Sequence, residues 1–108
     1  MMEELLAELQ QEKILIQVDE DIKELIPGYL ANRRQDIISL QQALAAGDYR
    51  SIQFIAHGLK GSGGGYGFEF ISQLGGLLEE AARKQQAEPV RQLIGLLDEY
   101  LQKVDLSD

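Results

Sequence analysis

The only histidine of the chain, His57, lies in the stretch AHGLKGSGGGYG, which also holds Lys60 and six glycines within ten residues. A neutral imidazole carries a free ring nitrogen that acts as a nucleophile near physiological pH. Lys60 follows three residues later, which on a helix places its positive charge one turn away from His57. The stretch therefore combines a nucleophile, a cation and a backbone with few side chains.

The helix that would carry His57 has a clear inward stripe, made by Ile52, Ile55, Ala56 and Leu59. At about 100° per residue, His57 falls about 140° from Ile52, well outside this stripe. The imidazole is therefore expected to face solvent. The same outer surface would hold Arg50, Gln53, Phe54, Lys60, Gly61 and, if the helix continues that far, Gly64.

The glycines in this region call for two explanations. Each glycine inside a helix costs about 1 kcal/mol relative to alanine. A turn into the next helix accounts for Gly67 and the run at residues 63–65, but not for Gly58 or Gly61, which lie upstream of the turn. For Gly58 and Gly61 we expect the close approach of a partner molecule.

The rest of the chain is rich in residues that favour helices. Its length of 108 residues fits one small domain. Apolar residues at three- and four-residue spacing predict an all-α fold, an antiparallel four-helix bundle with an additional short N-terminal helix. We divide the chain into an N-terminal helix and connector (1–18) and the bundle (19–106). The expected elements are a helix at 2–13, an extended connector at 14–18, a long helix from an N-cap at Asp19 or Asp21 to Gly47 with a kink or break at Pro27, and helices at 48–62, 68–85 and 88–104.

Composition excludes several classes of function. The chain has no cysteine, which removes disulfides, thiolate metal sites and cysteine nucleophiles, and one histidine cannot form a His-rich metal site. A net charge of −8 argues against nucleic acid and anionic membranes as partners. The acidic N-terminus lacks the pattern of a signal peptide, and no apolar run is long enough to span a bilayer, so we expect a cytoplasmic protein.

The stretch AHGLKGSGGGYG resembles the signature of the histidine phosphotransfer (HPt) domain, and the similarity extends over about residues 19–104. Positions that match the signature are His57, Leu59, Lys60, Gly61, Ser62 and Gly67. The flanking segments LIPGYLANRRQDIISLQQALAAGD and LGGLLEEAAR resemble the helices before and after the active helix of these domains. The N-terminal 18 residues lie outside the resemblance, as a packing helix, a dimer element or a truncated linker.

This resemblance implies an intermediate of a phosphorelay. His57 would accept a phosphoryl group from the aspartate of one receiver domain and pass it to another receiver. Lys60 would offset the phosphoryl charge, and Gly61 would leave room for the edge of the receiver's active site. The implied partners are response-regulator receiver domains and a hybrid sensor kinase, and Mg²⁺ would be supplied by the receiver, since we find no intrinsic cofactor or metal site. The protein would be a phosphoryl carrier without autokinase activity.

Other residues of the outer face have weaker assignments. Arg50 and Gln53 would contact phosphate or hydrogen-bond the ring, although a solvated surface role is equally consistent with their positions. Phe54 is assigned to partner docking, against the alternative that it packs on the N-terminal segment. Gly58 and Gly64 are assigned to the binding surface with Gly61.

Charged and polar residues elsewhere are read as structural. Ser62 is expected to bond the backbone or pack tightly rather than act as a nucleophile. Arg33 and Arg34 are interpreted as an exposed pair that would at most border the docking surface. Glu79 and Glu80 are interpreted as a solvated helix face.

Two other functions compete with the phosphorelay reading. A phosphate-binding loop would need its lysine after the glycines and a strand before them, whereas here Lys60 precedes the run at residues 63–65 and the upstream segment is helical. A non-catalytic helical adaptor, a degenerate HPt-like module that binds receiver or kinase domains, would not need the combination of His57, Lys60 and Gly61. A complete histidine kinase does not fit, because 108 residues cannot hold an ATP-binding domain beside the bundle.

Overall fold

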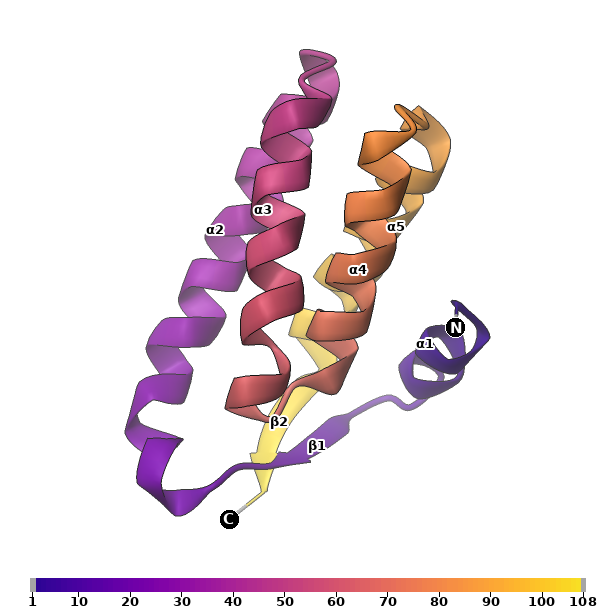
Figure 1. The fold of residues 1–108 in the computed structure, drawn as a ribbon. Coiled ribbons are helices and arrows are strands. Elements are labelled where there is room, and N and C mark those ends of the chain that lie inside the picture. Colours follow the sequence, from indigo (N-terminus) through magenta and orange to yellow (C-terminus); the bar gives the residue numbers. More distant parts are fainter. Residues whose placement is uncertain (1, 108) are drawn as a thin grey trace.

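The structure is a computed structural model that describes residues 2–107. Four long helices run alternately up and down and form an antiparallel bundle, with a short helix packed beside it (Figure 1). The all-α fold predicted from the sequence is therefore confirmed. The elements are α1 (Met2–Leu9), β1 (Ile14–Gln17), the 3-10 helix η1 (Glu20–Leu25), α2 (Ile26–Ala45), α3 (Tyr49–Ser62), the 3-10 helix η2 (Gly64–Tyr66), α4 (Glu69–Arg83), α5 (Ala87–Lys103) and β2 (Val104–Ser107).

Helix α2 begins later than the sequence indicated. Asp19 caps η1 rather than the long helix, and its side chain accepts a hydrogen bond from the backbone N–H of Asp21. Helix α2 then starts at Ile26, with Pro27 in its first turn, where the missing N–H of proline costs no helical hydrogen bond. The break expected near Pro27 is thus present, and it separates η1 from α2.

Both ends of α3 follow from local sequence. At its start the Asp48 side chain accepts a hydrogen bond from the backbone N–H of Ser51, so the predicted N-cap is confirmed. The hydroxyl and the backbone N–H of Ser51 both donate to the Asp48 carboxylate, and these two hydrogen bonds lower its pKa. At its end the chain turns through η2 and reaches Gly67 at φ 93°, a left-handed conformation that glycine adopts without strain.

The connector at residues 14–18 is part of a two-stranded parallel sheet, which the sequence analysis did not foresee. Strand β1 pairs with β2, with Ile14 opposite Val104. Consequently α5 ends at Lys103, and Val104 begins a strand instead of closing the helix. The alternation in β1 is real, because Ile14 is buried whereas Leu15 is 62% exposed.

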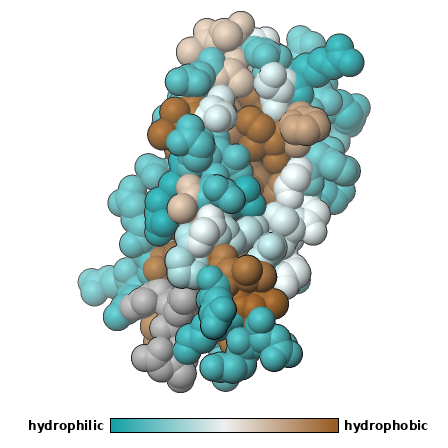
Figure 2. Space-filling view, turned by 90° about the vertical axis from the view of Figure 1, so that its left-hand side faces the viewer, coloured by the Kyte–Doolittle hydropathy of each residue, from teal (hydrophilic) through white to brown (hydrophobic). Residues whose placement is uncertain are grey.

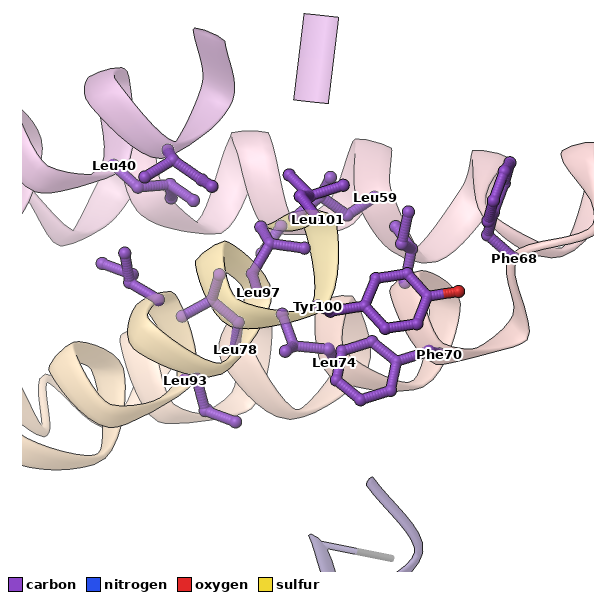
Figure 3. Close-up of a cluster of buried hydrophobic side chains, with 14 of the residues drawn as sticks. Leu40, Leu59, Phe68, Phe70, Leu74, Leu78, Leu93, Leu97, Tyr100 and Leu101 are labelled. Carbon is purple, nitrogen blue, oxygen red and sulfur yellow. The ribbon is translucent and has the colours of Figure 1, made fainter. Parts of the chain in front are cut away.

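The core lies between the four long helices. Figure 3 shows Leu40 of α2, Leu59 of α3, Leu74 of α4 and Leu97 of α5 directed into one apolar cluster. Buried residues of α1 belong to the same cluster, so α1 is a packing helix of the domain, as one of the three alternatives proposed. These residues of α1 are Leu5 and Leu9. No helix within residues 2–107 is long and apolar enough to cross a membrane.

Candidate functional site

His57 lies on the outward face of α3, as the helical geometry predicted. Its side chain is 76% exposed, whereas Ile52, Ala56 and Leu59 on the opposite face are almost completely buried. Lys60 is also exposed, one turn further along the helix. The imidazole and the ammonium group are therefore both accessible from outside the bundle.

Glu79 of α4 contacts both residues, contrary to our interpretation of it as part of a solvated face. One carboxylate oxygen lies 2.9 Å from Nδ1 of His57, and the other lies 3.8 Å from Nζ of Lys60. The side chain is only 29% exposed. Its neighbour Glu80 does match the sequence interpretation, since it pairs with Arg83 and Lys84 at the surface.

The contact with Glu79 determines which nitrogen of His57 is free. An ionised carboxylate only accepts hydrogen bonds, so the neutral ring must carry its proton on Nδ1 and donate it to Glu79. Nε2 then keeps its lone pair and faces away from that contact. The ring therefore has an unprotonated Nε2, and the side chain of Lys60 lies nearby.

The glycines on the outer face of α3 have no packing role. A Cβ atom built at Gly58 or at Gly61 meets nothing within 4 Å, and both residues are exposed. Gly64 is different, because α3 ends at Ser62 and Gly64 lies in η2, where its N–H donates to Ser72 Oγ at 2.7 Å. Gly64 was expected on the outer face only if the helix continued that far, and the helix ends before it.

Phe54, Gln53 and Arg50 precede His57 on the same helix. Phe54 is 82% exposed, so the alternative that it packs on the N-terminal segment is wrong. Arg50 is exposed and Gln53 is half-buried on the same helix. Among residues 2–107, neither side chain hydrogen-bonds the imidazole of His57, whose partner is Glu79.

Arg33 is an integral part of the bundle rather than one of an exposed pair. Its guanidinium lies over the ring of Tyr29 at 4.5 Å and forms an ion pair with Asp36 at 2.8 Å. Burial raises the pKa of Asp36, and the charge of Arg33 opposes this effect. Arg34 is exposed, as expected.

Ser62 joins this group through its side chain instead of the backbone. Its hydroxyl lies 3.0 Å from the Tyr29 hydroxyl and accepts a longer hydrogen bond, at 3.5 Å, from Arg33. These contacts tie the last residue of α3 to α2. Ser62 therefore fixes the end of the helix that carries His57, in agreement with a structural role.

An open depression runs between α2 and α3 beside the histidine. Arg33 and Asp36 line it from α2, and Phe54, Gly58 and Ser62 line it from α3. Figure 2, which views the side of the molecule formed by α2, shows apolar surface exposed among hydrophilic side chains. His57 is thus bordered by a partly apolar surface with room for another molecule.

The described part of the chain offers no metal centre of its own. Residues 2–107 contain no group of three or more His, Asp or Glu side chains that could hold a metal ion. At the site itself, the carboxylate of Glu79 is already engaged by His57 and Lys60. The Glu79 carboxylate is placed to accept a hydrogen bond from the imidazole.

The contact of Glu79 with His57 was not predicted from the sequence, because it depends on how α3 and α4 pack together. The available signal was a carboxylate immediately after Leu78, at the edge of the apolar stripe of the next antiparallel helix. Such a position can reach across to the neighbouring helix, 22 residues away along the chain in this case.

Comparisons with known proteins identify the family. Residues 1–106 match the Hpt domain, including the N-terminal 18 residues that the sequence resemblance had left out. Searches of curated proteins and of solved structures gave no match. Hpt domains transfer phosphoryl groups through a histidine in phosphorelays, as carriers that interact with the receiver domains of two-component systems. Because the match covers nearly the whole chain, the protein belongs to the Hpt domain family.

Proposed function

We propose that His57 is the phosphoryl-carrying residue of a phosphorelay intermediate, which accepts the group from an aspartyl phosphate of one receiver domain and passes it to the aspartate of another. The observation that carries this proposal is the hydrogen bond between Nδ1 of His57 and Glu79, at 2.9 Å on an exposed face. It leaves Nε2 unprotonated and accessible in the neutral ring.

The transfer step follows from this arrangement. The lone pair of Nε2 attacks phosphorus, an N–P bond forms, and the P–O bond to the receiver's aspartate breaks, which leaves that aspartate as a carboxylate. The ring keeps its proton on Nδ1 and acquires a positive charge, which faces the carboxylate of Glu79. The reverse sequence passes the group on, and no proton has to leave the site in either direction.

Lys60 and the outer glycines support transfer in different ways. Lys60 stands one turn from His57 and reduces the charge of the phosphoryl oxygens, because phosphoryl transfer depends mainly on positioning and electrostatic stabilisation. Gly58 and Gly61 keep the surface low enough for the receiver's active site to reach Nε2. Phe54 provides an exposed apolar contact for docking, and Arg50 and Gln53 border it.

The partners follow from the same chemistry. We assign Mg²⁺ to the receiver, because the carboxylate at this site is committed to His57 and Lys60. The donor would be the receiver domain of a hybrid sensor kinase, and the chain would act as a phosphoryl carrier without kinase activity of its own.

Labelling with a phosphorylated receiver tests this function. Incubation with a receiver carrying radiolabelled phosphate and Mg²⁺ should label the wild-type chain, with a label that is labile to acid and stable to alkali. His57→Gln should abolish the label while it preserves the helical content, because the side chain is 76% exposed. Label that survives in His57→Gln would refute the assignment. Binding of the receiver without any labelling would favour the adaptor function.

A further inference from the structure

We propose that Gly75, on α4, is a positioning residue for His57. The missing side chain at this position lets α4 approach α3 closely enough for Glu79 to reach Nδ1 of the imidazole. The proposal rests on the proposed function of His57, and it adds the element that sets the geometry of that site.

The contact at Gly75 is between backbones. A Cβ atom built there would lie 2.5 Å from the backbone nitrogen of Lys60 and 2.9 Å from both the carbonyl oxygen of Ala56 and Cβ of Leu59. None of these atoms can move away by a change of side-chain rotamer. Any residue other than glycine therefore has to displace one helix relative to the other.

Gly75 lies at the centre of a seam that holds the turn of α3 bearing the histidine. Ser72, Gly75, Gly76 and Glu79 lie along one side of α4, because residues three, four and seven positions after Ser72 fall on the same side of a helix. Ser72 Oγ donates to the carbonyl of Lys60 at 3.0 Å. A Cβ built at Gly76 would make an ordinary contact, 3.8 Å from Cδ of Lys60. Each of these residues touches the turn that presents His57 and Lys60.

The size of the displacement decides the consequence for the site. Non-bonded carbon atoms pack at about 3.5–4.0 Å, so a methyl group at Gly75 has to move α4 by about 1 Å from α3. Glu79 follows Gly75 by one helical turn and moves with it. Its hydrogen bond to His57, now 2.9 Å, would then exceed the length at which such bonds stabilise a tautomer.

The tautomer of His57 gives a readout that packing alone would not change. We would record ¹⁵N spectra of the neutral imidazole in a Gly95→Ala background protein. The same spectra would be recorded after Gly75→Ala, Gly76→Ala or Glu79→Ala is added to this background. Gly95 is an exposed helical glycine whose added Cβ meets nothing within 4 Å, so this background offsets lost stability without touching the site.

We expect the background protein and Gly76→Ala to hold the proton on Nδ1. Gly75→Ala should move it toward Nε2, as Glu79→Ala does, and should slow phosphoryl uptake from a receiver about tenfold, the effect of losing a charge-assisted hydrogen bond. In the Glu79→Ala background, Gly75→Ala should change the tautomer no further. Circular dichroism should show that all variants remain helical.

Three results would overturn the inference. They are an unchanged tautomer in Gly75→Ala, an equal shift in Gly76→Ala, or unfolding of Gly75→Ala even in the stabilised background, which would make Gly75 a packing residue only. The proposed function fails separately, because the tautomer is measured without a phosphoryl donor. A chain that shows the expected tautomers but takes no phosphate would retain the positioning role of Gly75 and lose the phosphorelay assignment.

Discussion

The two sides of α3 use glycine for opposite physical reasons. On the outer side, Gly58 and Gly61 face open space, and a Cβ at either position would meet nothing within 4 Å. On the inner side, where α3 packs against α4, Gly63 directly follows α3 and Gly75 belongs to α4. Both are buried where a Cβ would approach backbone atoms to 2.6 Å and 2.5 Å. The inner glycines are required by the packing of α3 against α4, whereas within the described residues no packing contact requires the outer glycines.

This difference separates the fold from the function. A glycine in a helix costs about 1 kcal/mol relative to alanine, and at Gly58 and Gly61 no internal contact compensates for that cost. The receiver that we propose to dock on the outer face, next to His57, would supply that compensation. Of the packed glycines, Gly75 is the one that we propose sets where Glu79 lies relative to the histidine.

The largest effect that would test this comparison is expected on the inner side, at Gly63. A methyl group there would lie 2.6 Å from the backbone nitrogen of Ser72 and 2.8 Å from the carbonyl oxygen of Phe68. We expect Gly63→Ala to lower the free energy of unfolding by about 1–3 kcal/mol, the usual cost of overpacking a core. Urea denaturation followed by circular dichroism measures it.

Gly58→Ala is the matched control, because it adds the same methyl group to the open side of α3, whereas Gly63 directly follows the last residue of that helix. It should raise the free energy of unfolding by up to about 1 kcal/mol, from helix propensity alone. Destabilisation by both substitutions would show that the two sides do not differ in the way proposed.

A somewhat smaller effect is expected on transfer rather than stability, at Gly61. Gly61→Gln places a long side chain on the exposed surface one turn after His57, where the receiver is proposed to dock. The helical signal in the far-UV spectrum and the urea midpoint of unfolding should not decrease. The rate of phosphoryl transfer from a receiver should drop about tenfold, which corresponds to about 1.4 kcal/mol. Loss of the fold would instead make Gly61 a packing residue.

Much of the fold was predictable because its signals are local. The caps and apolar spacings placed α3, α4 and α5 within two residues of their observed ends. The pairing of β1 with β2 was not predictable in this way, since it joins residues about 90 positions apart and each strand has only four residues. The start of α2 at Ile26 was missed because Asp19 gives an equally good capping signal for the short 3-10 helix before it.

The site was predictable to the extent that it lies on one helix. The outward positions of His57, Lys60 and Phe54 followed from helical geometry, whereas the contact of Glu79 depends on the packing of α4 against α3. Arg33 was misjudged for the same reason, since the ring of Tyr29 and the carboxylate of Asp36 hold it against the bundle. Residue type and spacing do not reveal such contacts between helices.

The isomer of the phosphorylated histidine tests the central claim most directly. The wild-type chain would be phosphorylated by a receiver labelled with phosphate, and its ring examined by ³¹P and ¹⁵N NMR at alkaline pH, where phosphohistidine is stable. Because Glu79 engages Nδ1 of His57, we expect phosphorus bonded to Nε2 alone. Phosphorus on Nδ1, or on any residue other than His57, would contradict the proposed site.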